Sequence, residues 1–306
     1  MTPAGLSGRD AYKDELLALA RQDDRVVCIE TDVGGHNHVF QAEFPDRFFN
    51  LGIAEAAAID IAVGMAKAGL RPYLSTFATF ATYRAAESLK LGLGYIGAPV
   101  VLVCPYGGLA GAWYGPTHHA VDDLAVVQAI PGVTIGVPCG EQETRSALRY
   151  VHAAGKPAYL RLARNESHAA SGHPEPGRIN WCRVPVAGAP ILVSVGERSS
   201  ELCSAASDLR DGVGHAQLCW LDGDHLIAAV AELTQRSRHL IFVEEHRLPG
   251  SVASTVAVLA RDAEVTSVNV GTGWASVGGD HRDVLAAYGV TVEAVCAAID
   301  NSKEFQ

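Results

Sequence analysis

Short apolar stretches alternate with amphipathic stretches along almost the whole chain, and this alternation limits the possible folds more than any other feature. Strand candidates such as "RVVCIETD" and "RPYLSTF" are separated by helix candidates such as "AYKDELLALARQD" and "EAAAIDIAVGMAKAG". Strands joined through helices pair in parallel, because the chain crosses back over the sheet before each new strand. The sequence therefore predicts an α/β fold of mostly parallel sheets, each flanked by helices.

The alternation is interrupted once, which predicts two domains. The stretch "NESHAASGHPEPGRINW" at 165–181 is rich in Pro, Gly, Ser and His, as a linker would be. Four further strand candidates follow it: "APILVSVG", "GHAQLCWLDG", "RHLIFVEEH" and "AEVTSVNVG". We predict a first domain at 1–165, a linker at 166–185 and a second domain at 186–306. A chain of 306 residues is long enough for both.

Composition and charge exclude several classes of function. The formal charge of −10 argues against non-specific binding to nucleic acid or to an anionic membrane. No apolar run reaches transmembrane length, and the first twenty residues lack the pattern of a signal peptide. The seven cysteines form no CxxC pair, which favours a reducing, cytoplasmic setting. Neither a GxxxxGK[ST] loop nor a convincing GxGxxG fingerprint is present, so nucleotide chemistry has no local support.

Four polar or aromatic places follow predicted strands, where open α/β sheets usually build their sites. Each has a structural alternative: an acid can cap a turn or begin a helix, and regularly spaced aromatics can belong to the core. The four places are Asp32-Val33-Gly34-Gly35, Glu55, the series Phe77, Phe80 and Tyr83, and the turn around His118.

Metal binding has little support in the sequence. His118 and His119 are adjacent, so their side chains point in different directions and cannot easily hold one ion. The pair His36 and His38 has better spacing but no third ligand nearby in the sequence. We therefore predict no metal ligands in this chain.

Several motifs, in one order, resemble the C-terminal half of transketolase, a thiamine-diphosphate enzyme. They are "FFNLGIAEAAAIDIAVGMAKAG", "STFATFATYRAAESL", "GPTHH", and "VEEH" followed by Pro249-Gly250. The resemblance runs from "SGRDAYKDELLALARQDDRVVCIETDVGG" to "VLAAYGVTVEAVCAAI" and therefore covers nearly the whole chain. It implies a pyrimidine-binding domain followed by a transketolase C-terminal domain.

The resemblance also implies roles for the candidate residues in cofactor binding. Glu55 matches the catalytic glutamate that hydrogen-bonds N1′ of the cofactor's aminopyrimidine and so activates the thiazolium carbon. Phe80 matches the aromatic that stacks on this ring, with Phe77 and Tyr83 completing the pocket wall. Asp32 matches an acid near the thiazolium side of the cofactor.

The substrate side is implied in the same way. His118 matches a catalytic histidine that points at the substrate carbonyl, whereas His119 is expected to be structural. Arg164 matches an arginine that contacts the substrate phosphate, and a strand would direct Arg161 to the opposite face. The alternative for Arg164 is a structural ion pair with acids of the linker.

One stretch departs from the family pattern. Transketolases typically have "THDSIGLGEDGPTH" before and through the turn, where this chain has "PYGGLAGAWYGPTH". Tyr106 and Tyr114 then replace a histidine and an aspartate that bind substrate, and Trp113 replaces a glutamate. We therefore expect an acceptor other than an ordinary pentose or tetrose phosphate, although drift in an enzyme that still uses ribose 5-phosphate is the alternative.

A family feature is missing as well. Complete transketolases carry a GDG motif with a downstream Asn that binds Mg²⁺ and the diphosphate. Here the nearest string is Asp222-Gly223-Asp224, in the second domain. We therefore expect a separate subunit to hold Mg²⁺ and the diphosphate, in an α2β2 heterotetramer that acts on small sugars. The alternatives are the β subunit of a 2-oxoacid dehydrogenase, a deoxyxylulose-phosphate-synthase-like enzyme, or a non-catalytic partner.

Overall fold

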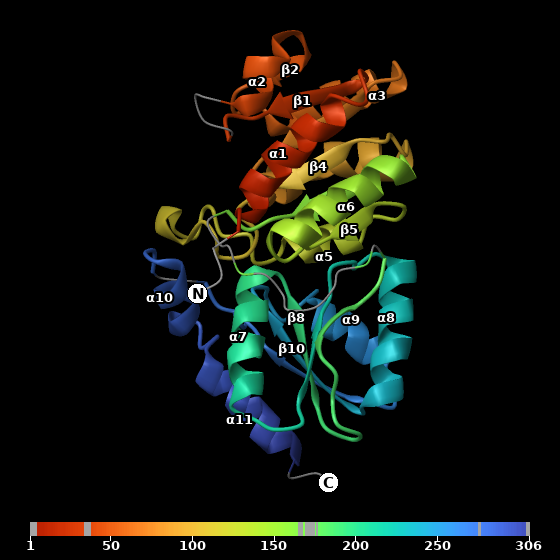
Figure 1. Cartoon of the computed structure of the whole chain (residues 1–306). Coiled ribbons are helices and arrows are strands. Elements are labelled where there is room, and N and C mark those ends of the chain that lie inside the picture. Colours follow the sequence, from red (N-terminus) through yellow and green to blue (C-terminus); the bar gives the residue numbers. More distant parts are fainter. Residues whose placement is uncertain are drawn as a thin grey trace.

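The computed structural model describes residues 5–33, 38–164, 168, 175, 177–274 and 277–303. The described chain forms two α/β units stacked end to end, each a sheet with its helices. The N-terminal unit, called the first layer below, lies above the C-terminal unit, called the second layer, in Figure 1. The predicted fold class is confirmed. Within the described residues, no helix is long and apolar enough to cross a membrane.

The first sheet is entirely parallel, in the strand order β2-β1-β3-β4-β6-β5. Its central strands are buried on both faces because helices cover each side, as expected for a parallel sheet. Its strands are β1 (Val26–Glu30), β2 (Phe48–Asn50), β3 (Arg71–Ser75), β4 (Val101–Cys104), β5 (Thr134–Gly136) and β6 (Ala158–Arg161). Its α-helices are α1 (Gly8–Ala20), α2 (Val39–Glu43), α3 (Glu55–Lys67), α4 (Ala86–Ser88), α5 (Asp123–Gln128) and α6 (Gly140–Ala154).

The second sheet has the order β11-β10-β8-β9-β7 and is parallel except for the antiparallel pair β7–β9. Its strands are β7 (Asn180–Arg183), β8 (Ile191–Val195), β9 (Gly214–Gln217), β10 (His239–Glu244) and β11 (Glu264–Val268). Its helices are α7 (Glu197–Asp208), α8 (Gly223–Arg236), α9 (Val252–Leu259), α10 (His281–Ala287) and α11 (Val292–Lys303). Strand β7 lies inside the segment 166–185 that the sequence predicted as a linker, so this part of the segment belongs to the second sheet.

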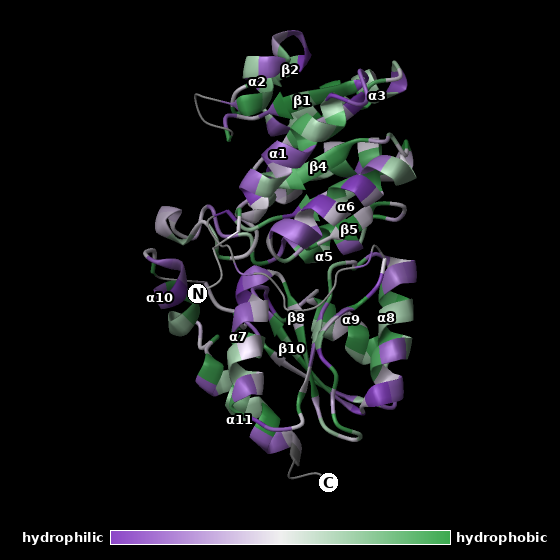
Figure 2. Ribbon diagram, viewed as in Figure 1, coloured by the Kyte–Doolittle hydropathy of each residue, from purple (hydrophilic) through white to green (hydrophobic). Residues whose placement is uncertain are grey.

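Hydropathy explains the layering. In Figure 2 the strands are mostly hydrophobic, whereas helices such as α6 and α8 have hydrophilic residues interspersed with hydrophobic ones. The two sheets are joined by backbone hydrogen bonds from Val137 to Cys219 and from Leu221 to Ile135, at 2.7 and 2.9 Å. One hydrophobic cluster continues from the first layer into the second, so the two layers pack directly on each other.

The chain after β3 forms three short helical parts instead of one helix: a π-helical turn at Phe80–Arg84, the short α4, and a second π-helical turn at Leu89–Tyr95. The Thr82 hydroxyl donates to the carbonyls of Ala78 and Thr79, at 2.9 and 3.4 Å. This side chain competes with the backbone for the carbonyl that an α-helix would use. The short helices Pro45–Arg47 and Ala112–Tyr114 are 3₁₀ turns.

Candidate functional site

Glu55 is buried at the first position of α3, with 2% of its surface exposed. Its Oε1 accepts a hydrogen bond from Arg84 Nη1 at 2.8 Å. Its Oε2 has no hydrogen-bond partner among the described residues. The N-terminus of the helix favours a negative charge here. A buried oxygen without a partner is costly to the fold, so this carboxylate is well placed to bond a group from outside the chain.

Arg84 contacts or influences three of the candidate residues, and it was not itself a candidate from the sequence. Besides bonding Glu55, its guanidinium carbon lies 4.1 Å from the centre of the Phe80 ring. Burial and the charge of Arg84 lower the pKa of His118. Arg84 lies within the block "STFATFATYRAAESL", but its spacing did not single it out, and only the fold shows that it faces Glu55.

An aromatic cluster stands beside this pair. Phe77 stacks on Tyr106 with 4.3 Å between ring centres, and Tyr114 stacks on His118 at 4.6 Å. His118 meets Phe80 edge-on at 5.1 Å and Phe77 edge-on at 5.3 Å. Residues from the turn after β3 and from the turn after β4 therefore form one continuous aromatic wall. His118 also contacts the Thr117 hydroxyl through Nδ1 at 3.0 Å, which orients the imidazole.

Arg164 lies over the edge of this wall. Its guanidinium carbon is 4.9 Å from the Tyr106 ring centre and 5.0 Å from the Trp113 ring centre. Its Nε is buried without a hydrogen-bond partner among the described residues. Arg161, by contrast, is buried and donates to Asp123 Oδ2 at 2.9 Å. The two arginines thus lie in different surroundings, and Arg164 is the one whose guanidinium faces the aromatic wall.

Two candidate residues adopt a strained backbone conformation. Among the described residues other than glycine, only Asp32 and Tyr106 have a positive φ, at 62° and 64°. Such conformations cost energy for residues with a side chain and concentrate at functional sites. Asp32 is exposed at the end of β1. Gly34 and Gly35, which the sequence grouped with Asp32, lie outside the described residues.

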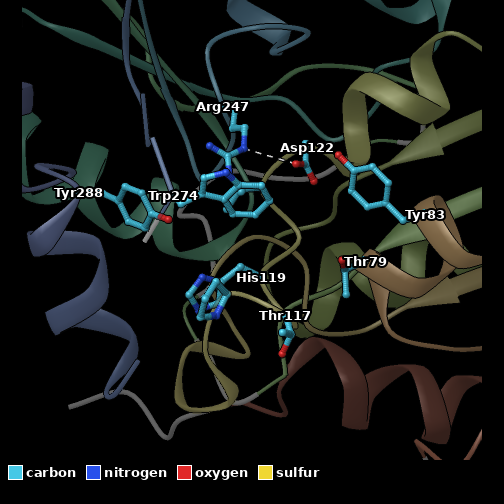
Figure 3. Close-up of a pocket in the computed structure, with 10 residues that line it drawn as sticks. Thr79, Tyr83, Thr117, His119, Asp122, Arg247, Trp274 and Tyr288 are labelled. Atoms are coloured by element: carbon cyan, nitrogen blue, oxygen red, sulfur yellow. Dashed lines mark hydrogen bonds and ion pairs between the residues drawn. The ribbon is translucent and has the colours of Figure 1, made fainter. Parts of the chain in front are cut away.

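Tyr83 lines a cavity of about 410 Å³ between the first and second layers. Figure 3 shows its ring directed towards Asp122, with Arg247, Trp274 and His119 around the same space. Burial and a hydrogen bond to Asp122 raise the pKa of Tyr83 to about 12. Glu55, Phe80 and His118 do not line this cavity, so Tyr83 belongs to different surroundings from the aromatic wall.

The second sheet holds the loop that carries His118. Glu245, in the "VEEH" stretch, accepts a hydrogen bond from the Leu109 backbone at 2.9 Å and contacts His281 Nε2 at 2.7 Å. Burial pushes the pKa of Glu245 up, but His281 and these hydrogen bonds hold it below its usual range. His246 Nε2 accepts from the Ala125 backbone at 3.3 Å. These contacts attach the loop at Leu109 and the helix α5 to the second sheet.

The remaining singled-out residues have local partners. His119 is buried, and its Nε2 lies 3.5 Å from the Ala112 carbonyl. Asp222 precedes α8, contacts His225 Nδ1 at 2.9 Å and accepts from the Ile135 backbone at 3.4 Å. The Asp222-Gly223-Asp224 sequence is thus part of the junction between the two layers.

Residues 4–168 match the family described as transketolase, pyrimidine binding domain. A putative uncharacterized transketolase family protein of Sinorhizobium fredii is 32% identical over 79% of this chain and 72% of its own length. One subunit of the apulose-4-phosphate transketolase of Phocaeicola vulgatus is 28% identical over 94% of this chain and 95% of its own length.

A solved structure described as a split gene transketolase, in the form of an inactive beta4 tetramer, superimposes with a TM-score of 0.81 at 27% identity. The superposition covers 97% of this chain and 98% of that one.

Proposed function

The chain belongs to the transketolase family, and on this premise we propose that it is the pyrimidine-binding subunit of a thiamine-diphosphate-dependent transketolase divided between two chains. The observation that carries the proposal is the Glu55 carboxylate, which is buried at a helix N-terminus with Oε2 free of any described partner. The aromatic wall beside Glu55 supports the same function, and Arg84 connects the two because it bonds Glu55 and lies over the Phe80 ring.

The residues of this chain fit the aminopyrimidine half of the cofactor. Glu55 Oε2 is a buried acceptor without a described partner, and the ring nitrogen N1′ in its protonated form would donate a hydrogen bond to it. Phe80 offers an aromatic surface, one face of which already carries the Arg84 guanidinium, and Phe77 braces it. When bound, thiamine diphosphate supplies the nucleophilic carbon for transfer of a two-carbon unit. Arg84 keeps the Glu55 carboxylate oriented. Asp32, which is exposed just after β1, is proposed to face the thiazolium side of the cofactor.

His118 and the aromatic wall form the substrate side. A lowered pKa keeps the imidazole of His118 neutral near pH 7, so it can exchange a proton with a substrate hydroxyl or carbonyl oxygen. The Arg164 guanidinium is the cation for a substrate phosphate. Tyr106, Trp113 and Tyr114 replace polar groups of the family with aromatic surface, which suits an acceptor that is larger or more apolar than an ordinary pentose phosphate.

A second chain is proposed to hold the diphosphate and Mg²⁺. The support is that this chain spans 95% of a relative named as one subunit of a transketolase and 98% of a chain from a split gene transketolase. The net charge of −10 is unsuited to a diphosphate without a metal ion. We propose two copies of each chain in the active assembly, because paired symmetric interfaces form closed oligomers.

The proposal is tested by combining this chain with the proposed second subunit, which is recognised by a GDG motif with a downstream Asn. A ketose donor such as xylulose 5-phosphate should support transfer, whereas pyruvate should not. Turnover of pyruvate with acyl transfer to a lipoyl group would instead make the protein part of a 2-oxoacid dehydrogenase.

A further inference from the structure

One loop of the first layer carries most of the residues proposed to bind substrate, and its two ends are joined. The loop runs from 108 to 120 and includes Trp113, Tyr114 and His118. The Gly108 amide donates to the Ala120 carbonyl at 3.1 Å, and the Ala120 amide donates to the Gly108 carbonyl at 2.8 Å. This segment, called the substrate loop below, is therefore closed at its base like an Ω-loop.

The base of the substrate loop rests on Glu245, which follows β10 in the second layer and is buried. Its Oε2 accepts a hydrogen bond from the Leu109 amide at 2.9 Å and lies 2.7 Å from Nε2 of His281, the first residue of α10. Gly108 has a φ of 61°, and a Cβ at this position would lie 2.6 Å from Glu245 Cβ. Only glycine leaves room for a side chain so close to the loop backbone.

Arg161 joins the other end of the loop to the same point. Its Nη2 donates to the carbonyl of Ala120 at 2.8 Å and to the carbonyl of Glu245 at 2.9 Å. Its Nε donates to Asp123, so the guanidinium is fixed on both sides. One buried side chain therefore ties the end of the substrate loop to the segment of the second layer that carries Glu245.

The tip of the loop meets the second layer as well. The Gly279 amide donates to the Ala112 carbonyl at 3.3 Å. A Cβ at Gly278 would lie 3.3 Å from that carbonyl and 3.5 Å from Gly115 Cα, so the two backbones are in close contact. These glycines come just before α10, whose first residue is His281. The second layer thus holds the substrate loop at both its base and its tip.

We propose that Glu245 is a positioning residue, through which the second layer keeps the substrate loop in the arrangement that binds substrate. It acts through the Leu109 amide rather than by contact with substrate. Glu55 and Phe80, which are proposed to bind the cofactor, lie outside the loop, so substrate binding depends on Glu245 whereas cofactor binding does not. The inference rests on the proposed function, because that function assigns the loop to the substrate side.

Three variants separate positioning from general stability. Glu245→Leu removes the acceptor of the Leu109 amide at similar side-chain size, whereas Glu245→Gln keeps a carbonyl for it. The matched control is Glu244→Leu, because Glu244 is also buried and accepts hydrogen bonds from the Val252 and Ala253 amides, both at 2.9 Å, at the start of α9. Both leucine variants leave buried amides without an acceptor, so both should lower stability. Only Glu245→Leu releases the substrate loop.

Hydrogen exchange of the full chain reports the order of the loop without substrate or a second subunit. The amides of the substrate loop should exchange at least about tenfold faster in Glu245→Leu than in Glu244→Leu. In Glu245→Gln they should stay within about threefold of the wild type. Exchange in Glu245→Leu no faster than in the Glu244→Leu control would overturn the proposal.

A variant at the tip decides the question if Glu245→Leu does not fold. Gly278→Ala presses on the Ala112 carbonyl, whereas a Cβ at Gly273 meets no atom of the described residues within 4 Å. Loop exchange should be at least about threefold faster in Gly278→Ala than in Gly273→Ala. Equal exchange in these two variants would overturn the proposal.

The second readout is activity with the proposed second subunit. Glu245→Leu should raise the KM for substrate at least about tenfold, while the thiamine diphosphate concentration that gives half-maximal activity changes less than about twofold. Equal changes in both quantities, or in neither, would contradict a positioning role for Glu245. If the wild-type assembly transfers no ketol unit, the proposed function fails instead, and hydrogen exchange still tests whether Glu245 holds the loop.

Discussion

The coupling free energy of the ion pair between Arg84 and Glu55 can be measured with a double-mutant cycle of Arg84→Met and Glu55→Gln. Methionine keeps an unbranched side chain over Phe80 but removes the guanidinium. Glutamine keeps the shape of Glu55 but removes its charge. The cycle therefore isolates the charged interaction that the 2.8 Å contact represents.

The expected magnitude follows from the burial of the two partners. A hydrogen bond to a charged group contributes about 1.5–3 kcal/mol net. The Arg84 side chain is 47% exposed, against 2% for Glu55, so solvent weakens the pair. We expect a coupling energy of about 1 kcal/mol. Arg84→Met should cost about 1.5 kcal/mol in the wild type, where it strands a buried carboxylate, and about 0.5 kcal/mol beside Glu55→Gln.

Urea unfolding of the four proteins, followed by circular dichroism, gives the four free energies. The comparison requires equal denaturant slopes, because a changed slope reports a changed unfolded or native state. A coupling energy below about 0.3 kcal/mol would refute the claim that Arg84 and Glu55 stabilise each other, since unconnected sites are additive within this margin.

Three other changes have defined outcomes. Arg164→Ala in the reconstituted enzyme should raise KM for a phosphorylated substrate much more than for an unphosphorylated one; equal effects would favour a structural role. Tyr114→Asp should raise kcat/KM for ribose 5-phosphate, whereas ordinary transketolase efficiency in the wild type would end the altered-acceptor hypothesis. Burial raises the pKa of Glu143 to about 8, against 4.5 for the free side chain, so the folded chain keeps a proton that the unfolded chain has lost and stability falls as pH rises through this window. Glu143→Gln should therefore raise Tm at about pH 8 more than at about pH 5, and equal shifts at both would contradict the burial argument.

Much of the fold follows from sequence pattern. The buried parallel strands β1, β4, β8 and β10 were predictable because each contains a run of mainly apolar residues bounded by turns. Strands β2 and β7 were not predicted, since each has only three or four residues and lacks a buried apolar pattern. The broken helix after β3 depends on the Thr82 hydroxyl, which a periodicity argument does not represent.

Site residues that lie in a recognisable sequence motif were predictable, whereas contacts between distant segments were not. Glu55, Phe80 and His118 were found through blocks of sequence that resemble a family. The contact of Arg84 with Glu55 joins two segments that lie 29 positions apart, so no local spacing in the sequence predicts it.

The proposed role of Glu55 is to activate the cofactor through its carboxylate, and turnover with Glu55→Gln tests this role most directly. The substituted chain would be combined with its diphosphate-binding partner and assayed with a ketose donor. Glu87→Gln, at an exposed acid on α4, is the control. We predict that kcat falls at least about 100-fold with Glu55→Gln and stays unchanged with Glu87→Gln. Turnover of the Glu55→Gln enzyme at the wild-type rate would contradict the account.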